Sequence, residues 1–144
     1  MIREMRVEDA AGVTEVFLTS LGYADSREAV VAQRIAELSD DSRHYLRVWA
    51  DDDTGDVQGF IHAVRYDTLH DEGGWDVIAL AVLPCAQGHG IGRQLLEACE
   101  AHVRASGGTF VRLNSRMERT EAHGFYEHLG YACPKVQKYF RKRL

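Results

Sequence analysis

The sequence predicts an α/β protein in which two neighbouring strands run parallel. The first observation is an apolar run, Val77 to Leu83, which has the length and composition of a buried strand and ends at Pro84. Glycines that alternate with other residues follow, and apolar residues at helical spacing begin directly after them. A second short strand, Thr109 to Asn114, comes next. Because a helix joins the two strands, we expect a parallel strand–helix–strand crossover.

The second observation is an antiparallel hairpin that precedes this crossover. Residues His44 to Ala50 alternate in character, with Leu46 and Val48 on one face. The acidic segment Asp51 to Asp56 has the residue types of a turn, and Val57 to Tyr66 is then the partner strand. The next strand, predicted at residues 75–83, is apolar nearly throughout, which favours cover on both of its faces.

Shorter patterns predict the elements that flank these strands. A first edge strand is expected at residues 1–5, and Glu8 or Asp9 suits the positive end of a helix that carries Val13, Val16 and Phe17. The remaining elements are a helix over residues 27–38, a helix that Thr120 caps and Gly130 ends, and one or two strands within residues 132–144.

Length and composition favour one ordinary globular domain over residues 1–144. Hydrophobic residues make up 45% and charged residues 27%, and the formal net charge of −5 argues against general nucleic-acid binding. No apolar segment is long enough to span a membrane, and the first residues lack a signal core. The three cysteines have no metal-ligand spacing, so we expect a cytoplasmic protein with reduced thiols and no metal.

The glycine loop between the strand and the helix is the strongest functional signal. A loop of this kind presents unpaired backbone N–H groups at a helix N-terminus, where phosphate binds. Gly92 is followed by Arg93 rather than by Lys and a hydroxyl residue, so the loop is not a Walker loop. Arg93 also stands where the dinucleotide fingerprint requires its third glycine. A plain glycine turn is the alternative.

Two motifs resemble the GNAT family of N-acetyltransferases. The first is Gln87-x-x-Gly90-x-Gly92, preceded by Val82-x-Pro84, which resembles the acetyl-CoA pyrophosphate loop of that family. The second is Ala122-x-x-Phe125-Tyr126-x-x-x-Gly130-Tyr131, which is similar to its C-terminal helix. The opening residues, from Ile2 to Ala10, also look like the start of the family, whereas residues 20–75 match it only in the order of elements.

The resemblance implies a fold and an activity. The fold is a mixed, mostly antiparallel sheet of six or seven strands with a central parallel pair and about four flanking helices. The activity is direct transfer of an acetyl group from acetyl-CoA to a primary amine of a small molecule or peptide in a ternary complex, without a metal. A homodimer is possible by the same resemblance. The alternative is a non-catalytic acyl-CoA sensor, because fold does not fix function.

The resemblance also assigns roles to particular residues. Tyr126 would protonate the departing CoA sulfur, and Asn114 would hydrogen-bond the cofactor or acceptor unless it is a turn residue. The pyrophosphate would be held by the backbone of the loop, and the pantetheine by the backbone at the end of the strand. These two sets are Gln87, Gly88, His89, Gly90, Ile91, Gly92 and Arg93 for the loop, and Leu80, Ala81 and Val82 for the strand.

The general base is less well defined by the sequence. Asp76 stands at the strand position where the histone-modifying branch of the family has a catalytic Glu, but its side chain is one methylene shorter. A chain of water molecules serves in many relatives instead. The other candidates are His44 and the loop residues His70, Asp71 and Glu72.

Overall fold

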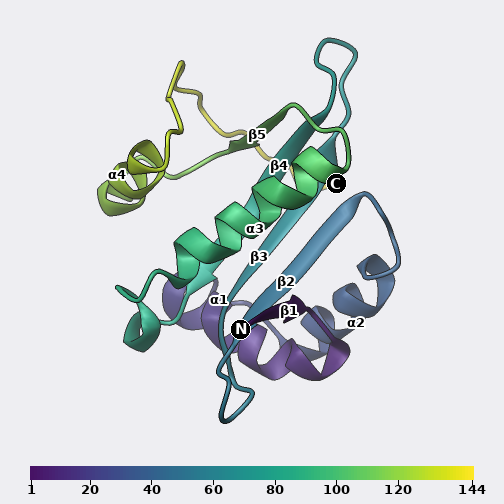
Figure 1. The fold of residues 1–144 in the computed structure, drawn as a ribbon, viewed down its shortest axis with the longest axis vertical. Coiled ribbons are helices and arrows are strands. Elements are labelled where there is room, and N and C mark those ends of the chain that lie inside the picture. Colours follow the sequence, from purple (N-terminus) through teal and green to yellow (C-terminus); the bar gives the residue numbers. More distant parts are fainter. The chain divides into compact units, whose positions relative to one another are not determined.

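A mixed sheet of five strands is the frame of the first 114 residues. The computed structural model describes all of residues 1–144, which form two compact units, residues 1–114 and residues 115–144. The strands follow the order β1-β2-β3-β4-β5, with antiparallel pairing from β1 to β4 and a parallel pair of β4 and β5 (Figure 1). Their bounds are Ile2–Glu4, His44–Ala50, Val57–Tyr66, Gly74–Val82 and Phe110–Leu113.

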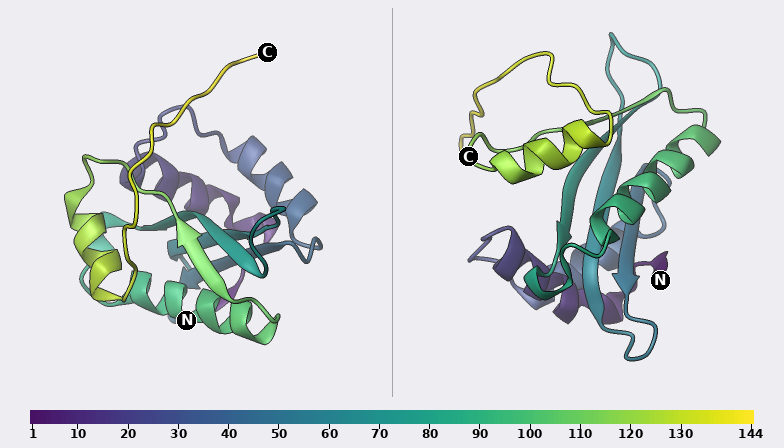
Figure 2. Two further views of the ribbon diagram at one scale, coloured as in Figure 1. Left: turned by 90° about the horizontal axis from the view of Figure 1, so that it is seen from above. Right: turned by 60° about the vertical axis from the view of Figure 1, so that its left-hand side comes forward.

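Three helices cover the two faces of this sheet. Helices α1 (Ala10–Ser20) and α2 (Glu28–Leu38) pack on one face, and α3 (Ile91–Ala105) packs on the other (Figure 2). Single 3-10 turns, Val7–Asp9 and Pro84–Ala86, precede α1 and α3. The alternation along the strands decides which side chains meet which helix.

The apolar core between α1, α2 and the sheet follows that alternation. Val16 of α1 and Ile35 of α2 are buried with Leu46, Val48 and Phe60 from the strands. The residues between them on β2 face the opposite way, and the Tyr45 ring lies 4.6 Å from the His102 ring of α3. The predicted hairpin and its two faces are thereby confirmed.

The second unit contains one helix, α4 (Thr120–His128). Arg119 is its N-cap and makes no side-chain capping bond, so Thr120 is the first helical residue rather than the predicted cap. Gly130 ends the helix as predicted, because its φ of +90° is left-handed and favours glycine. No helix in either unit combines the length and the apolar character that crossing a membrane requires.

The structure corrects the predicted sheet in two respects. The sheet has five strands rather than six or seven, because residues 132–144 form no strand. That segment includes Pro134, and its aromatic residues Tyr139 and Phe140 are exposed, so it has no buried face that a strand would need. In consequence the parallel pair of β4 and β5 lies at an edge of the sheet rather than at its centre.

Two smaller predictions concern Asp9 and the cover of β4. Asp9 stands at the N-cap of α1, at the helix end where it was predicted, but its carboxylate makes no capping bond and instead accepts hydrogen bonds from Arg3 and from the backbone N–H of Arg6. The strand β4 is not covered on both faces along its whole length. Ile78, an unpaired bulge residue opposite β3, is 50% exposed. The expectation of a single domain stays a prediction.

The buried pair of Arg3 and Asp9 ties β1 to the start of α1. The guanidinium donates to both Asp9 oxygens at 2.7 and 2.8 Å. Burial alone would raise the pKa of Asp9, but the hydrogen bonds from Arg3 and Arg6 outweigh it and lower that pKa. We expect Asp9→Asn to reduce the free energy of unfolding by about 2 kcal/mol, because it leaves a half-buried guanidinium without its partner.

Chemical denaturation measures this loss. Glu37→Gln is the matched control, since it breaks an exposed ion pair with Arg34 on α2, where solvent screens the charges. The control should leave the free energy of unfolding nearly unchanged. Equal stabilities of Asp9→Asn and the parent would show that the Arg3–Asp9 pair adds nothing to the fold.

Candidate functional site

The glycine loop presents a row of backbone N–H groups that have no acceptor within the protein. Those of Gly88, His89 and Gly90 donate to no backbone carbonyl. The next three belong to the first turn of α3, where a helix offers them no partner, and no side chain caps the helix. The first helical bond runs from the Gln94 N–H to the Gly90 carbonyl at 3.0 Å. The loop therefore offers hydrogen-bond donors and the positive end of the α3 dipole to an anion.

Two glycines give this loop its shape. Gly88 and Gly90 have φ values of +81° and +79°, a left-handed conformation that other residues rarely adopt. A Cβ at Gly88 would meet nothing within 4 Å, and one at Gly90 would meet only Gln94 Nε2 at 3.8 Å. The space in front of both glycines is thus open, and a ligand can approach the backbone closely.

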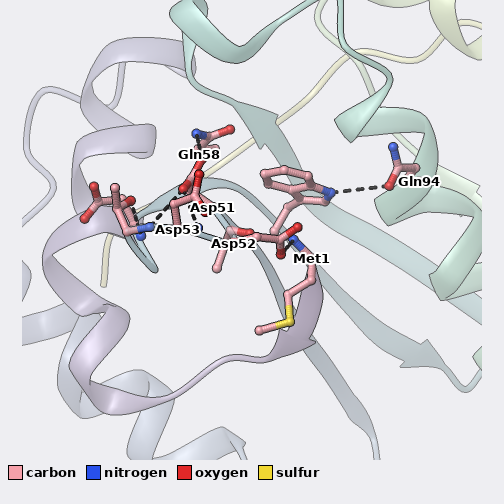
Figure 3. A network of polar contacts seen from close by, with 10 residues as sticks. Met1, Asp51, Asp52, Asp53, Gln58 and Gln94 are labelled. Atoms are coloured by element: carbon pink, nitrogen blue, oxygen red, sulfur yellow. Dashed lines mark hydrogen bonds and ion pairs between the residues drawn. The ribbon is translucent and has the colours of Figure 1, made fainter.

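The loop is anchored on both sides. The carbonyl of Val82 accepts hydrogen bonds from the Ser20 hydroxyl at 3.0 Å and from the Gln87 side chain at 3.1 Å. In the first turn of α3, Gln94 accepts a hydrogen bond from the indole of Trp49 on β2 at 3.3 Å. Figure 3 shows Gln94 together with the acidic turn after β2, where Asp51 accepts from Gln58 at 3.2 Å.

The end of β4 has a free edge beside the loop. Strand β5 pairs only with Gly74–Val77, so the following residues of β4 have no strand partner on that side. The Leu83 N–H donates to the Gln58 carbonyl on β3, and backbone groups alternate in direction along a strand. We infer that the backbone groups of Val82 and Leu80 point away from β3, whereas those of Ala81 point toward it.

This alternation divides the three strand residues that were assigned to the pantetheine. Leu80 and Val82 lie on the free edge, but Ala81 directs its backbone groups at its register partner, Phe60. The Val82 carbonyl already accepts two hydrogen bonds, which leaves its N–H group as the free donor. The structure thus places two of the three residues where a ligand backbone can pair with them.

A hollow of about 330 Å³ borders the loop on the side of β2 and β3. His89, assigned to the pyrophosphate, lines it, and its Nδ1 atom lies 3.3 Å from the Ala86 carbonyl oxygen. Ile91 is buried and closes the hollow from the start of α3. The side chains of both residues therefore support the loop, while their backbone N–H groups belong to the unpaired row.

Asp76 lies on the sheet face opposite α3. The ring of its neighbour Trp75 contacts His102 of α3 at 5.2 Å, so Asp76 points to the other face. Its Oδ1 atom is buried without a hydrogen-bond partner and lies 3.8 Å from Nε of Arg112 on β5. Burial raises the pKa of Asp76, although the Arg112 charge acts in the opposite direction. A carboxylate with a raised pKa is a stronger base than an ordinary Asp.

Arg112 is itself held from two other sides. Its guanidinium carbon lies 4.4 Å above the Tyr66 ring, and its NH2 group donates to Asn114 Oδ1 at 3.3 Å. Asn114, assigned to cofactor or acceptor, therefore orients Arg112 in this structure. The register places Arg112 directly opposite Asp76 across the parallel pair.

A pair of histidines lies on the same face. His44 Nδ1 and His62 Nε2 are 2.9 Å apart, and both rings are half-buried. Burial, then the neighbouring His44 and Arg34 charges, lowers the pKa of His62 to about 4. Of this pair, only His44 was predicted from the sequence as a candidate base. We call the five polar side chains on this face, His44, His62, Tyr66, Asp76 and Arg112, the polar strip.

The remaining candidate residues lie elsewhere. His70, Asp71 and Glu72 are exposed in the loop between β3 and β4, where two of their N–H groups bond to Thr68. Tyr126 lies on α4 in the second unit, where burial raises the pKa of its hydroxyl and its ring contacts Tyr131. No cluster of three or more His, Cys, Asp or Glu side chains is arranged to hold a metal ion, and all three cysteines are free.

Sequence reasoning missed His62, Tyr66 and Arg112. Each lies on a strand that was predicted, but none belongs to a motif. A signal was present for His62, because it falls in phase with Phe60, whose side chain is buried in the core. A titratable residue at a core-facing strand position is unusual and marks a site worth testing.

The fold and the loop together define a protein with a row of free backbone N–H donors at the start of α3, beside an open strand edge. Comparison with known proteins identifies the class. The sequence model of the acetyltransferase (GNAT) family matches residues 10–131. The chain therefore belongs to this family and is an N-acetyltransferase.

One relative in sequence supports this assignment, and two solved structures share the fold. The chain is 30% identical over 146 residues to an aminoalkylphosphonate N-acetyltransferase of Salmonella typhimurium, covering 97% of this chain and 87% of the relative. A transcriptional regulator from Bacillus halodurans has the same fold, with a TM-score of 0.88 at 20% identity over 99% of both chains. An aminoglycoside N-acetyltransferase in complex with CoA gives a TM-score of 0.85 at 18% identity, over 100% of this chain and 95% of the other.

The low pKa of His62 predicts a loss of stability in mild acid. The unfolded chain binds a proton at this residue near pH 6.5, whereas the folded chain binds it only near pH 4. The contribution of neutral His62 to the free energy of unfolding is therefore fully present above pH 6.5, and it falls as the pH drops from about 6.5 to about 4. Over that range His62 should lower the free energy of unfolding by about 3 kcal/mol at most.

Urea denaturation at several pH values measures this dependence. In His62→Gln the residue no longer titrates, so the free energy of unfolding should change less between pH 6.5 and pH 4 than it does in the parent. Parallel pH profiles for the two proteins would show that His62 is not held neutral by the fold.

Proposed function

We propose that this protein transfers the acetyl group of acetyl-CoA directly to the primary amine of a small molecule. The observation that carries the proposal is the row of unpaired N–H groups from Gly88 into the first turn of α3, which suits a pyrophosphate. The open space at Gly88 and Gly90 fits the same group, because a Cβ at either glycine would project into it. A solved structure of the same fold, an aminoglycoside N-acetyltransferase, is a complex with CoA.

The pantetheine would extend from the loop along the free edge of β4. The outward backbone groups of Leu80 and the N–H of Val82 would pair with its amides, as a further strand pairs with a sheet edge. The thioester would then lie near the bulge at Ile78, where β4 is exposed. This position brings the reacting carbon close to the strand that carries Asp76.

Transfer requires two proton movements. An amine with a pKa of about 10.4 arrives as an ammonium ion and must lose one proton before it attacks the thioester carbon. Asp76 would hold that ammonium, because its buried Oδ1 accepts no hydrogen bond and has only a long ion-pair contact, 3.8 Å from Arg112. As the C–S bond breaks, the sulfur takes up a proton, and we assign Tyr126 as its donor. The tyrosine remains protonated at neutral pH, since burial raises its pKa.

The names of two relatives support a small-molecule acceptor. One relative acetylates an aminoalkylphosphonate, and a protein of the same fold acetylates an aminoglycoside. Both kinds of acceptor carry a primary amine, and a peptide amine is the alternative for this chain. A screen of amines with acetyl-CoA that follows free thiol release tests the proposal. Binding of CoA without thiol release from any amine would favour a sensor.

The loop assignment predicts the effect of a substitution at Gly90. We expect Gly90→Val to abolish the thermal stabilisation that CoA gives, because the side chain would stand between the N–H groups and the pyrophosphate. Gly55→Val is the matched control, since Gly55 has nearly the same φ, +78°, but lies in the turn between β2 and β3.

Differential scanning fluorimetry with and without CoA provides the measurement. Both variants should have a lower Tm than the parent because both place a β-branched residue at positive φ. Only Gly55→Val should still be stabilised by CoA. Full stabilisation of Gly90→Val by CoA would show that the loop is not part of the CoA-binding site.

The assignment of Tyr126 predicts a specific kinetic change. Tyr126→Phe keeps the ring and removes the hydroxyl, so kcat should fall by about 100-fold if the hydroxyl protonates the sulfur. The KM for acetyl-CoA and the Tm should stay close to the parent values. Turnover at the parent rate, with chemistry shown to limit kcat, would mean that water supplies the proton and that Tyr126 only packs.

A further inference from the structure

The polar strip contains a histidine pair to which the proposed acetyl transfer assigns no role. His44 Nδ1 and His62 Nε2 are 2.9 Å apart, within hydrogen-bond distance. Both residues are half-buried, on strands whose same-face neighbours Leu46 and Phe60 belong to the apolar core. Burying two imidazoles costs free energy unless their nitrogens are hydrogen-bonded. The contact between the rings supplies one such hydrogen bond.

The strand register places this pair beside Asp76. His44, Val64 and Asp76 are aligned across β2, β3 and β4, so their side chains share one face. His62 stands two residues before Val64 on β3 and is therefore the diagonal neighbour of Asp76. Diagonal neighbours on adjacent strands lie about 7–8 Å apart at the backbone, a gap that two side chains and one water molecule bridge.

The contact between the rings determines how the pair handles protons. In the neutral pair one ring donates its N–H to the other, and two outer nitrogens remain. One outer nitrogen carries a proton and the other has a free lone pair, whichever ring donates. A proton taken up at the free nitrogen can shift across the 2.9 Å contact and leave from the far ring. The pair thus accepts a proton at one end and releases it at the other.

We propose that the His44–His62 pair removes the proton from the acceptor ammonium, through a water molecule beside Asp76, and passes it to solvent. This inference rests on the proposed acetyl transfer and supplies its base. Asp76 then holds the ammonium by its charge, while the imidazoles provide the basic nitrogen. The lowered pKa of His62 keeps its ring unprotonated at neutral pH, so a nitrogen lone pair is available to accept the proton.

The protons balance through the whole reaction. The ammonium gives one proton to the pair, and the free amine nitrogen forms a bond to the thioester carbon. The nitrogen then gives its second proton to water as the C–S bond breaks, the sulfur gains one from the Tyr126 hydroxyl, and the tyrosinate takes a proton back from water. The products are the amide, CoA with a free thiol, and one proton that the pair releases to solvent.

Charges of opposite sign lie near the two ends of the pair. Arg34 on α2 faces His62 and, with burial and His44, lowers the pKa of His62 to about 4. Asp41, in the turn before β2, faces His44 and favours a transient positive charge there. Asp76 on β4 adds a second negative charge on the acceptor side. The two ends of the pair thus face charges of opposite sign, and two adjacent imidazolium ions would repel each other.

The test uses His44→Gln and His62→Gln in the full chain, with His102→Gln as the control. His102 is another partly buried histidine with a lowered pKa, but it packs against Tyr45 and Trp75 on the α3 face. At pH 7 and saturating acetyl-CoA, each variant of the pair should lose about 100-fold in kcat/KM for the amine. The KM for acetyl-CoA should not change, and His102→Gln should retain the parent pH profile.

The pH profile separates a base from a structural residue. In the parent, kcat/KM should reach a plateau when the pair is neutral, whereas in the variants it should keep rising by about tenfold per pH unit with the fraction of free amine. Added imidazole should restore part of the lost rate at pH 7. Retention of the parent plateau and rate in both variants would overturn the inference.

Different results would contradict the proposed acetyl transfer and the base role of the histidine pair. If the parent chain releases no thiol with any amine, the proposed acetyl transfer fails, and the base role fails with it. If the parent turns over and the variants match it, only the role of the pair is lost. Nitrogen NMR of the two imidazoles gives a readout besides activity, because both rings should respond together as the pair takes up its first proton. Two independent titrations would contradict the relay.

Discussion

The separation of β5 from β4 after Val77 is the constraint on which the candidate site depends. The two strands pair in parallel over four register positions, and beyond them β4 continues alone toward the glycine loop. Unpaired backbone groups are costly when buried, so such an edge persists only where water or a ligand can satisfy it. The bulge at Ile78 lies at the beginning of this stretch, and it shifts the register of β4 on β3.

Contacts on both faces of the sheet hold the glycine loop in place beside this edge. Helix α3 is fixed to the sheet through buried residues such as Leu95 and Leu96, and its first turn is fixed to β2 by the bond between Trp49 and Gln94. On the other face, α1 contributes the Ser20 hydroxyl that holds the Val82 carbonyl. The loop N–H groups are thus held by rigid elements on both sides, which lowers the entropic cost of binding an anion.

The polar strip lies on the same face of the sheet as the apolar core under helices α1 and α2. Helices α1 and α2 cover the sheet near Val48 and Phe60, while the far end of that face carries charged and titratable side chains. Arg112 is oriented by Tyr66 and Asn114, and it keeps Asp76 partly neutralised without a direct hydrogen bond. Burial and these partners give the strip properties that none of its residues has in water.

The sequence by itself determined the strands, the helices, the parallel crossover and the glycine loop, because each depends on local periodicity and on the special conformations of Gly88, Gly90 and Gly130. It also indicated Asp76, through the strand position at which one branch of the family has a catalytic Glu. Only the tertiary structure decided that residues 132–144 form no strand and that the parallel pair lies at an edge. The strand register brought His62 to His44 across the hairpin and Arg112 to Asp76 across the parallel crossover, and the periodicity of a single strand does not show such pairings.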